Sequence, residues 1–374
     1  SWPKSESVLT AMDEFSRHCG AAAGRGAYAS ASQAGNLVAR LRRSIARTIG
    51  GESADSISFH ANGTAALNAA IHGLVRPGDH VVVTAAEHNS VLRPLHHLRQ
   101  HRGIEVTVVE VNRDGRVEVA EFLSALRPET RLACVTHASN VTGAVQPVEQ
   151  IGEAIRPMPT IFMCDAAQTF GTLPITVNDA AVDVLVAPGH KSIGGPLGTA
   201  FLYIDPRLHE QVACWMQGGT GSASESLEMP SEMPSMLEAG NLNVPALAGL
   251  NAAVELLDEA ELDRRRQDAR GLAERFRLGL AKLPHLRVHG PLDDLPIASL
   301  TIEGLSPADA AMILDAEFHV ETRSGLHCAA LIHGFLGTQR EGTLRLSAGH
   351  STSVQEIDAV LDALREIVTS MHES

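Results

Sequence analysis

The chain has 374 residues, of which 44% are hydrophobic, and it carries a formal net charge of −14. A chain of this length and composition can bury a large core, and no stretch of it has low complexity, so we expect a folded globular protein. The acidic balance argues against nucleic-acid binding, because a phosphate backbone requires a basic surface. For the same reason we expect no binding to an anionic membrane surface.

In chain order, short apolar runs alternate with helical patterns over the first two hundred residues. Strands are expected at residues 56–59, 79–84, 105–111, 131–136, 160–164, 182–187 and 199–204, and helices at 65–72, 90–102 and 117–126. Alternation of this kind indicates βαβ units. We therefore predict an α/β fold with a large, mostly parallel sheet.

The second half of the chain differs in composition. Residues 218–245 are rich in Gly, Ser, Met, Pro and Glu and show no period, which is typical of a long ordered loop. Beyond them we expect a helix at 254–283, strands at 299–303, 319–322 and 343–347, and an amphipathic helix at 354–371. These patterns predict a large domain over residues 1–245 and a smaller α+β domain over 246–374. We expect the extreme N-terminal segment to pack on the small domain.

Five cysteines are scattered along the chain without a C-x-x-C pair, which favours a reducing cytoplasm over a disulfide framework. We find neither a run of 18 apolar residues nor a recognisable signal peptide, and we expect a cytoplasmic protein. The chain begins at Ser1 rather than at a methionine, so we expect the natural N-terminus to lie further upstream. We expect no metal site, because the candidate ligands lack standard zinc spacing; these are His96, His97, His327 and His333.

Two neighbouring strands are predicted to end in side chains that suit a cofactor site. Lys191 follows the strand at 182–187 within a glycine-rich turn, and Asp165 ends the strand at 160–164. In open α/β sheets ligands bind beyond the carboxyl ends of the strands. A lysine there can reach a cofactor, and a carboxylate can pair with a protonated pyridine nitrogen. Taken singly, each motif also fits a surface lysine or a helix cap.

The third motif, NGTA at residues 62–65, lies where a strand gives way to a helix. Backbone N–H groups at a helix N-terminus, together with the hydroxyl of Thr64, can bind an anion. A simple N-cap explains this motif equally well.

Together with further motifs in the same order, these residues resemble the class V pyridoxal-phosphate (PLP) enzymes, specifically the cysteine desulfurase and selenocysteine lyase group. The resemblance covers nearly the whole chain and implies PLP fold type I with PLP as the cofactor. The matching segments are NGTAALN (62–68), EHNS (87–90), SNVTG (139–143), DAAQ (165–168), GHK (189–191), EAGN (238–241), RSGLHCA (323–329) and LRLS (344–347).

The resemblance implies a role for each matching side chain. Lys191 would bear PLP covalently and move protons at the substrate Cα, and Asp165 would hold the ring nitrogen. His88 would stack on the ring and assist proton transfer as a further catalytic residue. Asn140 and Gln168 would hydrogen-bond the ring oxygen. The phosphate would be bound by Gly63, Thr64 and His190. Gly219 and Asn241 of a second subunit would supply further phosphate contacts.

Three more residues imply the reaction. Arg345 would grip the substrate carboxylate as a bidentate fork, with Arg323 near the same group. Cys328 has small neighbours that suit a mobile loop, and it would take sulfur from L-cysteine as a persulfide, leaving L-alanine. Arg323 and His327 are expected as cationic partners of its thiolate. The resemblance also implies a homodimer and, for this short loop, a partner protein that accepts the sulfur.

Two alternatives stay open. One is another class V PLP enzyme, such as a selenocysteine or C–S lyase, an aminotransferase or an epimerase, in which Cys328 is incidental or acts on selenocysteine. The other is a nicotinamide-dependent oxidoreductase or a non-catalytic α/β binding protein. Against the latter, no G-x-G-x-x-G follows a predicted strand.

The chain departs from the usual family pattern at four positions. Ala65 replaces a residue that often bears a hydroxyl or a carboxyl group, and Gly189 replaces a serine or threonine near the phosphate. Asn241 replaces a threonine, and Ala330 replaces a proline. These changes affect phosphate and substrate binding. They leave the set of Lys191, Asp165 and Cys328 intact.

Overall fold

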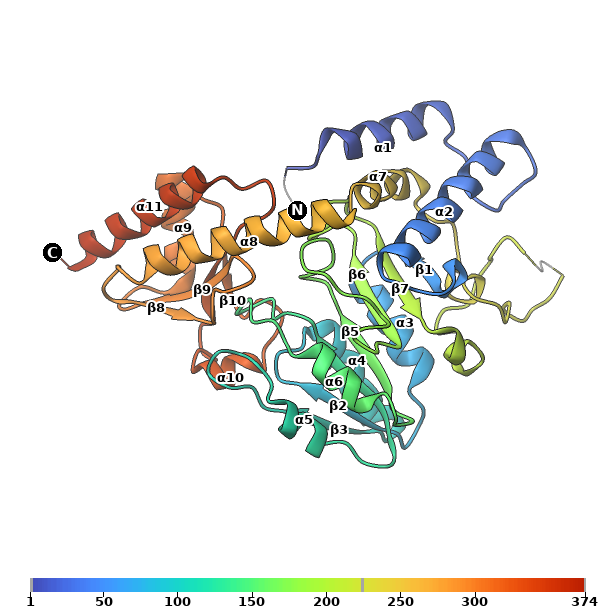
Figure 1. Cartoon of the computed structure of the whole chain (residues 1–374), viewed down its shortest axis with the longest axis horizontal. Helices are drawn as coiled ribbons and strands as arrows, with labels where there is room; N and C mark the ends of the chain where they lie inside the picture. The colour runs from blue at the N-terminus through green and yellow to red at the C-terminus, as the bar shows by residue number, and fades with distance from the viewer. Residues whose placement is uncertain (1–2, 223–224, 373–374) are drawn as a thin grey trace.

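The computed structural model describes residues 3–222 and 225–372. Within these ranges the chain forms two separate sheets (Figure 1). The larger has seven strands in the order β1 (Ile57–His60), β7 (Ala200–Ile204), β6 (Val184–Pro188), β5 (Ile161–Asp165), β4 (Thr130–Thr136), β2 (His80–Thr84) and β3 (Glu105–Val109). The smaller has four, in the order β10 (Arg323–Gly325), β11 (Thr343–Ser347), β9 (Ile297–Ile302) and β8 (Leu286–His289).

The large sheet is mostly parallel, as the sequence predicts. The pairs β2–β3, β2–β4, β4–β5 and β5–β6 are parallel, and only the pairings of β7 with β6 and β1 are antiparallel. The four-stranded sheet is antiparallel throughout. The predicted α/β fold with a smaller α+β part is therefore confirmed.

Helices cover both faces of the large sheet. Successive side chains of a strand point to opposite faces, so each face packs into a core of its own. Val82 of β2 packs in a core with α2 (Ala29–Thr48), α6 (Val148–Ile155) and α7 (Val244–Glu255). Its neighbours Val81 and Val83 pack in a second core with α3 (Gly63–Leu74) and α4 (Asn89–Arg102). A short helix, α5 (Val119–Ser124), contributes Phe122 to the first core.

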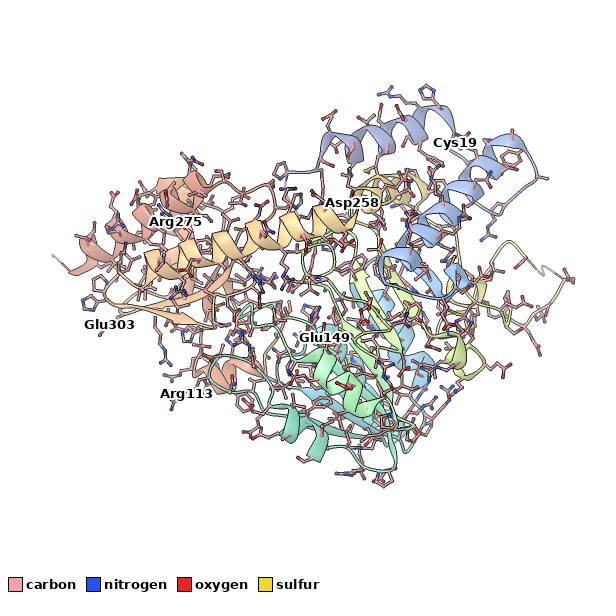
Figure 2. The ribbon with its side chains drawn as sticks, viewed as in Figure 1. Cys19, Arg113, Glu149, Asp258, Arg275 and Glu303 are labelled. Carbon is pink, nitrogen blue, oxygen red and sulfur yellow. The ribbon has the colours of Figure 1, made fainter. Side chains whose placement is uncertain are left out.

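A third core lies in the small part of the molecule. It packs β9 and β11 against α8 (Glu259–Leu280), α9 (Pro307–Phe318) and α11 (Val354–His372). Arg275 of α8 forms an ion pair with Asp358 of α11 at 2.6 Å and links the two helices (Figure 2). The short α10 (Ile332–Leu336) follows β10 and packs in a separate small cluster with Ala85 and Val141.

Two predicted elements were wrong. The helix predicted at 254–283 is α8, which begins only at Glu259, because Asp258 caps it by accepting a hydrogen bond from the Glu261 backbone N–H at 2.8 Å. The first two residues of the predicted range belong to the end of α7, a helix that the sequence did not predict. The strand predicted at 319–322 lies instead at β10, because His319 adopts a left-handed φ of 55° that ends α9.

The N-terminal segment packs on α7, which lies mostly within the predicted small domain (246–374) but contributes its side chains to the first core. Within α1 (Glu6–His18), Val8 and Phe15 are buried in the first core, and Val8 and Met12 lie against Gly249 of α7. Val8, Met12 and Phe15 recur at helical spacing, which gives α1 an apolar face that matches α7. The first two residues lie outside the described ranges.

Candidate active site

A cavity of about 570 Å³ lies where β5 and β6 end, with the small sheet on its other side. The cavity therefore lies at the edge of the sheet where the sequence predicts a ligand, beyond the carboxyl ends of the strands. Ten of its lining residues are ones that the sequence singles out: Gly63, Thr64, His88, Asn140, Asp165, Gln168, His190, Lys191, Arg323 and Arg345.

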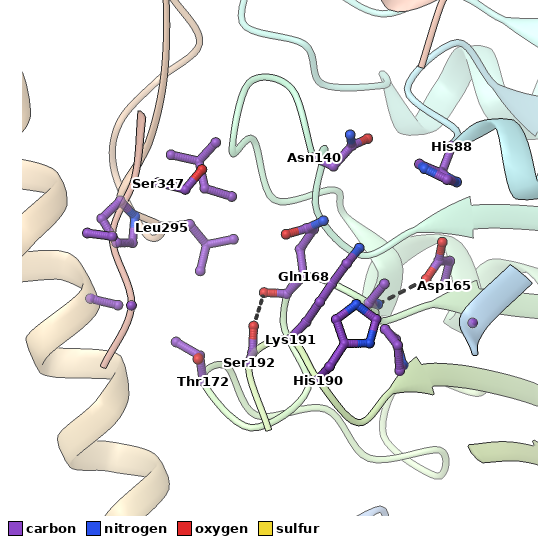
Figure 3. A pocket seen from close by; sticks show the side chains of 18 of the residues that line it. His88, Asn140, Asp165, Gln168, Thr172, His190, Lys191, Ser192, Leu295 and Ser347 are labelled. Carbon is purple, nitrogen blue, oxygen red and sulfur yellow. Dashed lines mark hydrogen bonds between the residues drawn. The ribbon is translucent and has the colours of Figure 1, made fainter. Parts of the chain in front are cut away.

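Lys191 and Asp165 face the same cavity from neighbouring strands (Figure 3). Burial lowers the pKa of Lys191, and the nearby Arg345 and Arg323 lower it further, while Asp165 opposes them. Burial also raises the pKa of Asp165, against the pull of Lys191 and a hydrogen bond from the Ala167 backbone N–H at 2.9 Å. A lysine in this setting becomes a neutral nucleophilic amine more easily than an exposed one.

His88 and Thr64 are held together by Ser90, to which the sequence assigned no role. The Ser90 hydroxyl lies 2.9 Å from Nδ1 of His88 and 2.7 Å from the Thr64 hydroxyl. Burial lowers the pKa of His88 to about 4, and Lys191, Arg323 and Arg93 add to this effect. The imidazole is therefore neutral near pH 7.

The N-terminus of α3 fits a phosphate group. Asn62 caps the helix by accepting a hydrogen bond from the Ala65 backbone N–H at 2.9 Å, and Gly63 and Thr64 begin the helix at the cavity wall. Nδ1 of His190 is buried and has no hydrogen-bond partner within residues 3–222 and 225–372. An unpaired buried polar atom beside a helix N-terminus is the environment that an anionic ligand completes.

Gly189, a departure from the family pattern, is explained by its surroundings. A Cβ at this position would lie 2.2 Å from the Thr199 hydroxyl and 2.9 Å from Cδ1 of Leu250. The Gly189 backbone N–H also donates to the Thr199 carbonyl at 2.9 Å. The space that a serine or threonine side chain would need is therefore taken by Thr199.

The arginines predicted to bind substrate lie on adjacent strands of the small sheet. Arg323 pairs with Arg345 across β10 and β11, and both line the cavity. Arg345 donates to the Asn140 carbonyl at 2.7 Å, while its buried Nε has no partner in the described part of the chain. Burial, reinforced by Arg323, lowers the pKa of Arg345 to about 10. Two cations with an unpaired donor form a suitable site for a carboxylate.

Cys328 is exposed, and its Sγ accepts a hydrogen bond from the Arg323 guanidinium at 3.2 Å. Arg323, the first of the two cationic partners expected for this thiol, is therefore in contact with it. The second, His327, turns away: its Nε2 lies 3.0 Å from the Thr343 carbonyl, and burial lowers its pKa to about 3. The prediction of His327 as a cation was therefore wrong, because a buried imidazole beside Arg345 stays neutral.

Gly219 and Asn241 lie outside the cavity of the single chain, and both are exposed. Their loops are joined, since Arg25 donates to the carbonyls of Gly219 at 2.9 Å and Gly240 at 3.0 Å. A role for them at a second subunit stays a prediction.

Arg265 is a further lining residue to which the sequence assigned no role. Arg265 of α8 is buried and donates to the carbonyls of Gly171 and Ser192, at 3.2 and 3.3 Å, while Glu261 pairs with it at 2.7 Å. It therefore fixes the turn that follows Lys191. Its sequence context, a charged run on a helix, gives no signal for such a role.

Among the described residues, no group of three or more His, Cys, Asp or Glu side chains is placed to hold a metal ion. Nor does any described helix have the length and apolar character needed to cross a membrane.

Comparison with known proteins identifies the family of this chain. The model of the family "Aminotransferase class-V" matches residues 2–360. A "Probable cysteine desulfurase" of Methanothermobacter thermautotrophicus is 33% identical over 96% of this chain and 91% of its own length. A "Cysteine desulfurase IscS" of Anaeromyxobacter sp. is 32% identical over 99% and 91%.

Solved structures agree with the fold. A cysteine desulfurase from Thermococcus onnurineus, solved in its apo form, superposes with a TM-score of 0.91 at 29% identity and covers 98% of this chain and 92% of its own. The cysteine desulfurase CsdA from Escherichia coli gives 0.88 at 25% identity, over 98% and 92%. The fold is thus PLP fold type I, and the cavity residues fit the cofactor. The chain belongs to the class V aminotransferase family of PLP-dependent enzymes.

Proposed function

We propose that this protein is a cysteine desulfurase, which removes sulfur from L-cysteine to give L-alanine and a persulfide on Cys328. The observation that supports this proposal most directly is the exposed Cys328 thiol, which lies 3.2 Å from the guanidinium of Arg323. Arg323 and Lys191 line the same cavity. Cys328 itself is not among the residues that line the cavity. A nucleophilic sulfur bound to an arginine of the cavity wall, with an amine nucleophile inside the cavity, suits sulfur abstraction. The names of the relatives support the same activity.

Bound PLP supplies an electron sink for negative charge at the substrate Cα. Its ring nitrogen would meet Asp165, its ring oxygen Asn140 and Gln168, and its phosphate the N-terminus of α3 with His190. Lys191 would carry the cofactor and, once substrate displaces it, take the Cα proton. Burial lowers the pKa of this amine, which favours the proton-accepting form.

The substrate carboxylate would bind Arg345, whose guanidinium is already oriented by the Asn140 carbonyl. Arg323 is shared between this carboxylate and Sγ of Cys328. Its charge stabilises the anionic sulfur before attack, and it brings substrate and nucleophile to one side of the cavity.

The sulfur-transfer step balances without an added oxidant. The thiolate of Cys328 attacks Sγ of the substrate, so an S–S bond forms and the Cβ–Sγ bond breaks. The carbon keeps the electron pair of the broken bond and takes a proton, which gives alanine. The transferred sulfur is oxidised to the sulfane level while the carbon is reduced. A thiol on an acceptor must then take the sulfur to restore Cys328.

The test is alanine and persulfide formation from L-cysteine by the wild type, Cys328→Ser and, as a matched thiol control, Cys214→Ser. We expect the first variant to lose alanine formation by about 1,000-fold and the control to keep it, because Cys214 does not line the cavity and its Sγ donates to the backbone carbonyls of Met216 and Met236. Full activity of Cys328→Ser on cysteine would remove this thiol from the mechanism and favour another class V reaction.

We further propose a homodimer, a sulfur-acceptor protein and a cytoplasmic location. Five free cysteines favour a reducing compartment, and the exposed thiol is open to an acceptor. We also propose two domains, of which the large one extends beyond the predicted residue 245. Support for this later boundary comes from Leu247 to Leu257, which pack in the first core, whereas the third core begins at Leu272.

A further inference from the structure

The backbone that presents the nucleophile has an unusual conformation. His327 and Cys328 adopt left-handed φ angles of 50° and 60° in succession, although neither is glycine. Such a pair is unfavourable for L-residues and persists only where the surroundings impose it. The contacts of this turn therefore show what holds the thiol in place.

Two of these contacts are hydrogen bonds that backbone carbonyls of the turn accept from Asn140 and Asn89. The His327 carbonyl accepts a hydrogen bond from Nδ2 of Asn140 at 2.6 Å. The Cys328 carbonyl accepts one from the backbone N–H of Asn89 at 2.7 Å, next to His88. Both carbonyls of the left-handed pair are thus fastened to the large part of the molecule.

The third contact is the imidazole of His327, which is 2% exposed. Its Nε2 lies 3.0 Å from both the carbonyl and the hydroxyl of Thr343, at the start of β11. A carbonyl only accepts, so Nε2 carries the proton and donates it there. The Thr343 hydroxyl in turn donates to Ser299 at 3.2 Å, and Ser299 donates to the Val141 carbonyl at 2.6 Å.

We propose that His327 is a positioning residue for sulfur transfer, whose Nε2–H···Thr343 bond holds Cys328 in its left-handed turn and keeps Sγ beside Arg323. The bond joins the nucleophile's turn to β11, the strand that carries Arg345. The thiol is thereby fixed relative to the arginine that orients the substrate. This inference rests on the proposed function, because the task it assigns belongs to sulfur transfer.

Two amide variants distinguish the hydrogen bond of His327 to Thr343 from a role in which the His327 side chain only packs. In His327→Gln the side-chain amide can reach the place of Nε2, whereas in His327→Asn it reaches only the place of Nδ1, which has no partner in the described part of the chain. We expect kcat for alanine formation from cysteine to fall about 100-fold in the Asn variant, with KM nearly unchanged, because misplacing a reacting group by about 1 Å costs this much. The Gln variant should keep at least roughly a third of the wild-type rate.

A second readout isolates the thiol from the rest of the site. Exchange of the Cα hydrogen of L-alanine in D₂O needs Lys191 and Arg345 but not Cys328, so it should stay within about threefold of wild type in both variants. Equal loss of exchange and alanine formation in the Asn variant would overturn the proposal. So would full alanine formation by that variant.

A third readout does not depend on the reaction. Alkylation of Cys328 by iodoacetamide at pH 7, followed by peptide mass spectrometry on the holoenzyme, should slow about tenfold in the Asn variant but not in the Gln variant, because Sγ leaves the Arg323 guanidinium. If the wild type forms no alanine, the proposed function fails, and unchanged alkylation in the Asn variant then refutes the positioning role separately. If the Asn variant does not fold, a Gln variant slowed about tenfold in alanine formation refutes it.

Discussion

The carboxyl group of Glu87 lies buried behind the cofactor residues, one position before His88. It accepts hydrogen bonds from the Thr136 backbone N–H and the Thr84 hydroxyl, each at 2.8 Å. Burial raises its pKa to about 8, the two hydrogen bonds lower it, and the negative charge of Asp165 raises it again. Burial outweighs the hydrogen bonds, so the neutral acid is the stable form in the folded protein at pH 7.

This environment predicts a pH-dependent stability. Because the folded pKa of Glu87 lies above its ordinary value of 4.5, its neutral form stabilises the fold at low pH. That stability is lost as pH rises from about 5 through 8. Glu87→Gln copies the neutral acid and does not ionise, so its Tm relative to wild type should increase across this range. A constant difference in Tm between pH 5 and 8 would show that Glu87 is already ionised.

Gly189 allows a prediction about the chain's departure from its family. Gly189→Ser should lower the free energy of unfolding by about 1–3 kcal/mol, because the added Cβ meets the Thr199 hydroxyl and Leu250. Thr199→Ala should restore most of this loss in the double variant, since it removes the nearest clash. Thermal melting of the two single variants and the double variant measures the coupling, and additive losses would contradict the explanation.

At the residue scale, the sequence predicts the groups that follow directly from strand ends. Lys191 and Asp165 meet because β5 and β6 are parallel neighbours. Side chains whose role depends on distant contacts were not predictable. Ser90 acts on Thr64, 26 positions away, and Arg265 holds the carbonyl of Ser192, 73 positions away. Neither pairing leaves a periodic or local signal.

At the scale of elements, the apolar strands of the large sheet and the final helix were predicted within a few residues. The N-terminal helices were not, because α2 has a polar average composition and its buried face becomes evident only against α7. The break between α7 and α8 was also missed. Leu256 and Leu257 continue the apolar pattern, so periodicity alone does not reveal it.

Asp258 is the residue that separates these two helices (Figure 2). Its carboxylate caps α8 through the Glu261 backbone N–H at 2.8 Å. Asp258→Ala should reduce the free energy of unfolding by about 1 kcal/mol, and Asp258→Asn should keep most of it, because asparagine caps equally well. Denaturant unfolding with both variants provides the comparison. Equal losses would mean that the charge rather than the cap stabilises this junction.

At the scale of the whole molecule, the cavity lies between parts with separate cores. Lys191 and Asp165 come from the large sheet, while Arg323 and Arg345 come from the small one. Cofactor and substrate residues are therefore held by different cores, and α8 connects the two (Figure 1). This arrangement explains why the α/β pattern predicts that the cofactor residues lie at the carboxyl ends of β5 and β6. It does not predict the geometry of the turn that carries Cys328, because this turn belongs to the small part of the molecule.

The loops of Gly219 and Asn241 suggest how two chains combine. They are exposed and lie outside the cavity of their own chain, and Arg25 ties them together. If they complete the phosphate site of a second subunit, each active site needs Lys191 from one chain and Asn241 from the other. Replacing Asn241 by aspartate then places a negative charge beside the phosphate and should inactivate the neighbouring site, not its own.

Mixed dimers test this arrangement directly. Lys191→Ala and Asn241→Asp homodimers should each be almost inactive, whereas a heterodimer purified through two different tags should have roughly half of wild-type activity, because one of its two sites combines an intact lysine with an intact loop. If each chain used its own loop, both sites of the heterodimer would be defective and its activity would stay near zero. A chain that yields no doubly tagged species is not a dimer. Recovery of half the activity therefore requires both an assembly of two chains and an active site shared between them.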